Sequence, residues 1–133
     1  SICTNPYLPW SHRSFRSGNG LVMAIARTKN VGISDYKLRL VMDQIRGKMV
    51  VDAFPMLRYM TSPAAAEIFK ILKAATANAE NNDLQSRDDL KIVRITADKG
   101  TWIRRYRPKA RGRVGAFDRP TSHVTIEVDE VRI

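Results

Sequence analysis

The 133-residue sequence predicts a compact body of mixed helices and strands from which a long, basic β-hairpin projects. Three observations support this prediction. Apolar residues recur at helical spacing over residues 34–82, and from residue 90 onward their period changes to two. Six basic residues fall within residues 104–113, and no acid separates them. The length suits one domain, which we assign to residues 21–133, preceded by an extended tail over residues 1–20.

A strand and a helix open the predicted domain. The strand is expected over residues 21–33, and the helix begins after Ser34, whose side chain suits an N-cap. Gly47 suits the C-cap, because glycine tolerates the left-handed backbone that ends many helices. The residues expected to face the core between these two caps are Leu38, Val41, Met42 and Ile45.

Two further helices are expected before the polar loop over residues 83–89. The first covers about residues 50–60, and Pro55 inside it predicts a short or bent helix, since proline removes a helical hydrogen bond. The second begins with Ser62 as its cap and Pro63 in its first turn. Its apolar stripe is rich in alanine, which permits close approach of another layer: Ala65, Ile68, Phe69, Leu72, Ala75, Thr76 and Ala79.

The last third of the chain predicts two long antiparallel strands joined by a projecting turn. The apolar positions that mark these strands are Ile92, Val93, Ile95, Val124, Ile126 and Val128. Pro108 and Gly112 flank the most basic part and place the tip near residues 107–112. The projecting hairpin covers about residues 98–119. A two-stranded ribbon of this length has no core of its own and needs a partner to order it.

The net charge of +10 is unevenly distributed, which indicates a nucleic-acid partner. Residues 31–97 hold ten basic and eight acidic residues, whereas residues 98–119 hold eight basic and two acidic ones. Arginine binds phosphate in a bidentate manner and stacks on bases, and irregularly spaced arginines suit folded RNA. Two alternatives stay open at this point. A ribbon can also enter the major groove of DNA, as in β-ribbon DNA-binding regulators, and a basic face can serve solubility alone.

The sequence does not contain the residue patterns of an enzyme or a metalloprotein. His12 and His123 are far apart and have no cysteine at metal-ligand spacing, and the single cysteine is Cys3. There is no phosphate-loop motif and no set of convergent acids, which disfavours an RNA-processing enzyme. We therefore expect no catalytic residue, no metal and no cofactor. No apolar run is long enough to span a membrane, so no membrane partner is expected.

The hairpin sequence resembles the bacterial-type large-subunit ribosomal protein twenty-two family. Residues 98–126 read DKGTWIRRYRPKARGRVGAFDRPTSHVTI and align without a gap to the pattern of that family. Further matching segments are IRGK at 45–48, ANAEN at 77–81 and KLR at 37–39. The resemblance covers about residues 24–130. Four replacements depart from the family pattern: Thr101 and Pro120, Lys109, and the pair Asp35–Tyr36.

The resemblance implies an α+β fold with three helices packed on a small three-stranded antiparallel sheet. It also implies a structural constituent of the large ribosomal subunit, bound to large-subunit ribosomal RNA and to neighbouring ribosomal proteins. The RNA-binding residues it implies are Lys37, Arg39, Arg46, Lys48, Lys99, Arg104, Arg105, Arg107, Lys109, Arg111, Arg113 and Arg119. The hairpin would line the nascent-peptide exit tunnel with a tip made of Arg107, Pro108, Lys109, Ala110, Arg111 and Gly112, which would face the nascent polypeptide.

The tail indicates an organellar address. Residues 1–20 contain serine and arginine but no acid, as the end of an organellar targeting peptide often does, so we expect a processed N-terminus. The aromatic residues of the tail, Tyr7, Trp10 and Phe15, can either pack on the body or stack on RNA bases. With the similarity of residues 42–48 to cyanobacterial and plastid sequences, the chloroplast ribosome is favoured over the bacterial cytoplasm and then the mitochondrion.

Overall fold

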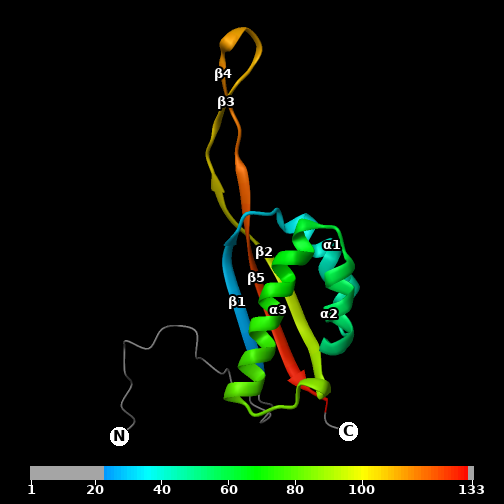
Figure 1. Cartoon of the computed structure of the whole chain (residues 1–133). Helices are drawn as coiled ribbons and strands as arrows, with labels where there is room; N and C mark the ends of the chain where they lie inside the picture. The colour runs from blue at the N-terminus through cyan, green and yellow to red at the C-terminus, as the bar shows by residue number, and fades with distance from the viewer. Residues whose placement is uncertain (1–22, 132–133) are drawn as a thin grey trace, which may run out of the picture.

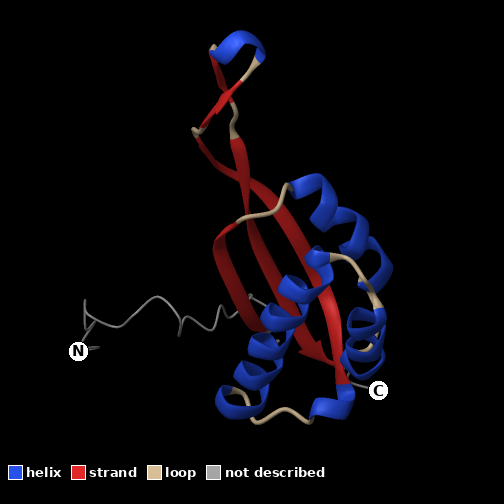
Figure 2. Ribbon diagram, turned by 45° about the horizontal axis from the view of Figure 1, so that its top comes forward, coloured by secondary structure: helices blue, strands red, loops and turns tan. Residues whose placement is uncertain are grey.

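Three helices cover one face of a three-stranded antiparallel sheet, and two strands of that sheet continue into a long ribbon (Figure 1; Figure 2). The structure is a computed structural model and describes residues 23–131, so the predicted tail lies outside the described residues. The elements are β1 (Ala24–Val31), α1 (Asp35–Ile45), α2 (Val50–Tyr59), α3 (Pro63–Asn82), β2 (Leu90–Ile103), β3 (Tyr106–Pro108), β4 (Val114–Ala116) and β5 (Arg119–Glu130). The predicted α+β class, with its protruding basic hairpin, is confirmed.

The last strand in the sequence, β5, lies in the centre of the sheet. The strand order is β1-β5-β2, and both pairings are antiparallel. Ile126 on β5 lies opposite Ala26 on β1 and Ile95 on β2. The sheet therefore joins the two ends of the domain sequence, because β1 and β2 both need β5 as their partner.

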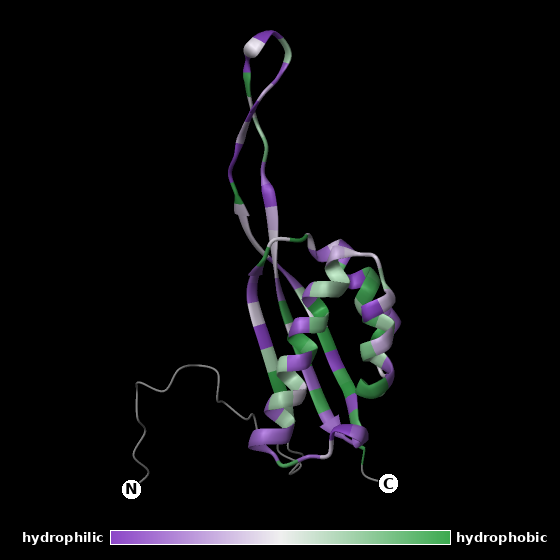
Figure 3. Ribbon diagram, viewed as in Figure 1, coloured by the Kyte–Doolittle hydropathy of each residue, from purple (hydrophilic) through white to green (hydrophobic). Residues whose placement is uncertain are grey.

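The core lies between the sheet and the helices. Val124, Ile126 and Val128 are fully buried, while the residues between them are half-buried on the other face of the sheet. This alternation follows from the two-residue period of a strand, and Figure 3 shows it as hydrophobic and hydrophilic segments in turn. On α3, fully buried alanines such as Ala65 and Ala75 let the helix pack closely on the strands.

Several details of the predicted elements need correction. The C-cap of α1 is Arg46, one residue earlier than predicted, and Gly47 follows it with a φ of 74°. Phe69 is only partly buried, although it packs against the core, and Ile71 belongs to the buried stripe of α3 in addition. Val93, one of the apolar positions that mark the predicted strand, is 47% exposed because it follows buried Ile92 and so points to the opposite face. The β-bulge between Ile92 and Arg94 shifts the register by one residue and returns Ile95 to the core.

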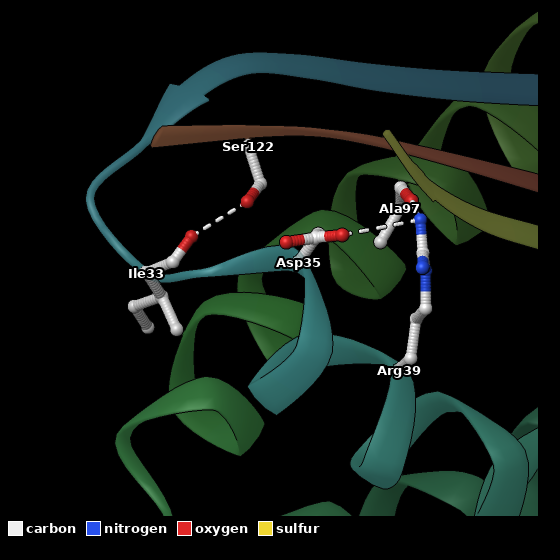
Figure 4. Close-up of polar contacts among 5 residues, drawn as sticks. All are labelled: Ile33, Asp35, Arg39, Ala97 and Ser122. Atoms are coloured by element: carbon white, nitrogen blue, oxygen red, sulfur yellow. Dashed lines mark hydrogen bonds and ion pairs between the residues drawn. The ribbon is translucent and has the colours of Figure 1, made fainter. Parts of the chain in front are cut away.

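Helix side chains bond to the backbone of both outer strands of the sheet (Figure 4 shows the contact on β2). The Arg39 guanidinium donates from Nε and Nη2 to the carbonyl oxygen of Ala97, at 3.2 and 2.9 Å. Arg46 Nη2 donates to the carbonyl oxygen of Ile95 at 3.4 Å. On the opposite edge, the Asn78 amide donates to the carbonyl oxygen of Ile25 at 3.2 Å. These bonds satisfy edge-strand acceptors that a neighbouring chain could otherwise pair with.

The ribbon leaves the body at an irregularity in the β2–β5 ladder. The register shifts between Lys99 and Trp102, and Gly100 lies against Thr121 on the opposite strand. A Cβ on Gly100 would lie 2.7 Å from Thr121 Oγ1 and 3.0 Å from its carbonyl oxygen, so a larger residue does not fit. Thr121 Oγ1 donates to the carbonyl oxygen of Thr101 at 2.6 Å. These contacts fix the point at which the ribbon departs.

Candidate nucleic-acid interface

The cations predicted on the hairpin are brought together on one projection of the molecule. β2 and β5 remain paired as far as Ile103 and Arg119, and β3 and β4 then continue the ribbon to its tip. All eight of the cations assigned to it are exposed: Lys99, Arg104, Arg105, Arg107, Lys109, Arg111, Arg113 and Arg119. The ribbon extends away from the helices, so these side chains are accessible without any movement of the body (Figure 1).

The ribbon cations lack carboxylate partners within the described residues. The three ion pairs found over residues 23–131 lie on α1, its C-cap and α3, one of them between Lys70 and Glu67. Of the two acids of the hairpin, Asp98 lies at its base and Asp118 lies between β4 and β5, and residues 99–117 contain no acid. The positive charge of the ribbon is therefore not neutralised within the described part of the chain and can bind external anions.

A tight turn forms the tip of the ribbon. The backbone N–H of Arg113 donates to the carbonyl oxygen of Ala110 at 3.3 Å, which closes a four-residue turn. Arg111 and Gly112 occupy its two central positions with φ values of 53° and 71°. Two consecutive positive φ angles are typical of a type I′ turn, where asparagine and glycine are preferred. An arginine at the first of these positions costs about 1–2 kcal/mol relative to an ordinary backbone conformation.

Two ribbon cations are held in place by neighbouring groups. The Arg107 guanidinium lies over the ring of Phe117, with Cζ 4.9 Å from the ring centroid. The aliphatic part of Lys109 lies against Gly115, in the space that a Cβ there would occupy. A cation stacked on an aromatic ring keeps its charge while it loses rotational freedom. These contacts therefore present two charges on the same side of the ribbon.

The four cations predicted on the body differ in their surroundings. Arg39 and Arg46 bond to the backbone of β2 and also pair with Asp35 and Asp43 of their own helix, at 3.3 Å each. About half of each arginine side chain remains exposed, at 52% and 54%. Lys37 and Lys48 are also exposed. Arg39 and Arg46 thus have structural contacts within the fold. RNA binding by all four body residues stays a prediction.

The described residues contain no cluster of metal-ligating side chains. No group of three or more histidine, cysteine, aspartate or glutamate side chains over residues 23–131 could hold a metal ion. His123 Nδ1 accepts a hydrogen bond from the backbone N–H of Asn30 at 3.1 Å, which is a structural contact. No helix within this range is long and apolar enough to cross a lipid bilayer.

Sequence reasoning missed the aromatic and apolar residues of the ribbon as part of this surface. Trp102, Tyr106 and Val114 are exposed by 59%, 73% and 73%. Their signal was present in the sequence, since aromatic residues interleave with arginines from residue 102 to residue 117. The faces on which they lie depend on strand register, which composition does not give.

A small α+β body with an unneutralised basic ribbon is typical of the class of structural nucleic-acid-binding proteins. Residues 26–129 match the family described as ribosomal protein L22p/L17e. The chain belongs to this family of ribosomal proteins, which is structural and not enzymatic. The family predicted from the hairpin sequence is therefore confirmed.

Bacterial relatives of this chain carry the name large ribosomal subunit protein uL22. The protein of Dehalococcoides mccartyi is 48% identical over 103 residues, which are 77% of this chain and 94% of the relative. The protein of Chloroflexus aggregans is 47% identical over 105 residues, or 79% of this chain and 93% of the relative. The protein of Pediococcus pentosaceus is 42% identical over 107 residues, or 80% and 91% of the two chains.

Proposed function

We propose that the protein is a structural constituent of the large ribosomal subunit that binds large-subunit ribosomal RNA through its ribbon and the adjoining body. The observation that carries this proposal is the exposed row of ribbon cations without carboxylate partners in the described chain. The assignment to the large subunit comes from the name of the relatives. A ribosomal protein binds RNA rather than DNA, which disfavours the alternative of a DNA-binding regulator. Neighbouring ribosomal proteins are the further partners that this setting implies.

The strained turn at the tip supports a binding role for Arg111. An arginine occupies a backbone conformation in which glycine or asparagine costs less. Strained residues of this kind concentrate at functional sites, where another requirement outweighs the conformational cost. Arg111 is exposed and makes no contact that would repay this cost within the described residues. We infer that its guanidinium is retained to bind an RNA phosphate.

The shape of the molecule supports a tunnel position for the ribbon. Beyond Gly100 and Thr121 each arm has roughly ten residues, which reach about 30 Å at about 3.3 Å per residue. A body on the subunit surface, anchored by Lys37, Arg39, Arg46 and Lys48, could therefore place the tip deep within the RNA. In the proposal the cations on one side of the ribbon bind phosphates, and the opposite side of the turn that closes the tip, within residues 107–112, faces the nascent polypeptide.

Deletion of Ile103, Arg104 and Arg105 tests the tunnel position. The core of the body lies elsewhere, so the variant is expected to fold and to enter large subunits. It should change the width of the exit tunnel and with it the response to macrolides or the stalling of nascent peptides. Lys73→Gln, which removes one exposed charge from α3, is the control and should change neither. Subunits that carry the deletion but have an unchanged tunnel structure, drug response and stalling would contradict the proposal.

The finer address that we propose is the chloroplast ribosome. The acid-free, serine- and arginine-containing composition of residues 1–20 supports an organellar address, and the family match begins only at residue 26. Sedimentation of the native protein from fractionated cells tests this address. Co-sedimentation with plastid large subunits supports it, whereas co-sedimentation only with ribosomes of another compartment contradicts it.

A further inference from the structure

The outer part of the ribbon has two chemically different faces. In the β3–β4 pair, Tyr106 lies opposite Ala116, Arg107 opposite Gly115, and Pro108 opposite Val114. Directly opposed residues of an antiparallel pair share a face, and successive residues along a strand alternate between faces. Four uncharged residues therefore share one face, which we term the apolar face: Tyr106, Pro108, Val114 and Ala116.

The other face of the outer ribbon carries positive charge, as two side-chain contacts show. Arg107 stacks on Phe117, and Lys109 lies against Gly115 on the side to which a Cβ would point. Because Gly115 is paired with Arg107, both cations lie on the same face. We term this the cationic face. Its two charges are pre-positioned by a ring and by a glycine, which reduces the conformational entropy lost when they bind phosphate.

The apolar face is uncovered in the described chain. Tyr106 and Val114 are each 73% exposed, and Pro108 and Ala116 are exposed as well. The ribbon has no second layer against which these side chains could pack, since β3 and β4 form a sheet of two strands. An aromatic ring and a proline exposed together in this way form a flat surface of the kind on which nucleobases stack.

We propose that the apolar face stacks on unpaired bases of RNA while the cationic face binds phosphates. This inference rests on the RNA-binding function proposed above. Charge complementarity selects the occupant, because the cationic face lies directly behind the apolar face: Arg107 follows Tyr106 along one strand, and Arg113 precedes Val114 on the other. A ligand that fits must be flat and uncharged at its centre and anionic at its margins. A nucleotide has this distribution, whereas an apolar polypeptide does not.

Tyr106 is the ring on which the proposal depends, so its truncation is the direct test. The full-length protein would be titrated with a single-stranded oligoadenylate and with an abasic oligomer of the same length, over a range of salt concentrations. Tyr106→Ala should weaken binding to oligoadenylate by about 5- to 150-fold, which is the usual range for one stacked base. It should leave the abasic affinity and the salt slope unchanged, because no phosphate contact is removed.

Two matched variants make the result specific. Arg107→Ala on the cationic face should lower the slope of log K against log salt by about 0.7 on both oligomers, as expected for one lost phosphate contact on a single strand. Tyr59→Ala removes a tyrosine that is 85% exposed on the body, and it should change neither affinity nor slope. Because Tyr106 is largely exposed, its truncation should also leave the thermal unfolding of the body unchanged.

The outcomes separate this inference from the function on which it rests. If Tyr106→Ala binds oligoadenylate as tightly as the wild type, or loses the same affinity for oligoadenylate and for the abasic oligomer, the apolar face does not stack on bases. The same conclusion follows if the variant retains RNA affinity but loses affinity for an apolar peptide, which would assign the face to polypeptide. If the wild type shows no salt-dependent binding to either oligomer or to large-subunit ribosomal RNA, the RNA-binding function fails instead.

Discussion

Arg39 on α1 donates two hydrogen bonds to the carbonyl oxygen of Ala97 on β2, at 3.2 and 2.9 Å (Figure 4). The two residues are 58 positions apart in the sequence. β2 is an outer strand of the three-stranded sheet, so the outward acceptors along it have no partner strand in the described chain. The guanidinium also pairs with Asp35 one turn earlier, which orients it toward β2. A residue that the family resemblance assigns to RNA is thus also part of the fold.

Arg39→Ala should destabilise the protein by about 1–2 kcal/mol, because hydrogen bonds from a charged donor contribute about that much. This loss of stability is at the low end of the range for such hydrogen bonds, because half of the Arg39 side chain is exposed to solvent. Lys37→Ala, an exposed neighbour on the same helix, is the control and should shift stability by less than about 0.5 kcal/mol. Denaturant unfolding monitored by circular dichroism measures both. Equal midpoints for the two variants would contradict a structural role for Arg39.

Ser122→Ala should destabilise the protein by about 1–3 kcal/mol, since it leaves a buried acceptor without its donor. Ser122 is fully buried, and its Oγ donates to the carbonyl oxygen of Ile33 at 2.7 Å, which ties the turn before α1 to the central strand. Ser62→Ala is the matched control, because the Ser62 side chain makes no cap bond to α3. Thermal unfolding of both variants checks the prediction, and a larger loss at Ser62 than at Ser122 would refute it.

Gly100→Ala should disturb the joint of the ribbon and cost about 1–3 kcal/mol, the usual range for overpacking. The added methyl group would meet both the side chain and the backbone of Thr121, and a backbone neighbour yields less readily than a flexible side chain. Gly32→Ala serves as the control, because a Cβ at Gly32 meets no atom within 4 Å. The joint is not a tight contact if the two variants unfold at the same temperature.

Amide hydrogen exchange on the free protein should separate the body from the ribbon. Helix α3 contains the fully buried residues Ile68 and Leu72, so its backbone amide hydrogens should exchange with solvent only through global unfolding. Those of β3 and β4 are held by three register pairs and no core, so they should exchange rapidly. Addition of large-subunit ribosomal RNA should slow exchange in β3 and β4. Strong protection of the ribbon without RNA would show that it is ordered by itself.

Periodicity was sufficient to predict the elements but not their mutual contacts. The apolar stripe of α3 and the alternation of β5 both arise from local spacing, and both were predicted correctly except at individual positions. Val93 lies on the outer face because it follows buried Ile92, and Ile95 faces the core only because of a bulge that leaves no local pattern in the sequence. The C-cap predicted at Gly47 lies one residue earlier, at Arg46, and a difference of one residue is usual for a helix end.

The candidate site was predictable in charge and not in orientation. Counting cations located the ribbon, because six basic residues without an intervening acid need no structure to be seen. The bond between Arg39 and Ala97 depends on a helix packing against a distant strand, so the family resemblance assigned Arg39 to RNA alone. The two faces of the outer ribbon follow from the register of Tyr106 with Ala116, which a slip of one residue would reverse.

The salt dependence of binding between the full-length protein and large-subunit ribosomal RNA tests the central claim most directly. Six phosphate contacts from the eight ribbon cations predict a slope of log K against log salt of about −4 to −5, at about 0.7–0.9 per contact. Neutralising Arg104, Arg105 and Arg107 together should make the slope less steep by about 2–3, whereas Lys73→Gln should leave it unchanged. A wild-type slope near zero, or a slope that is unchanged after the three arginines are neutralised, would contradict the claim that the ribbon binds RNA through its cations.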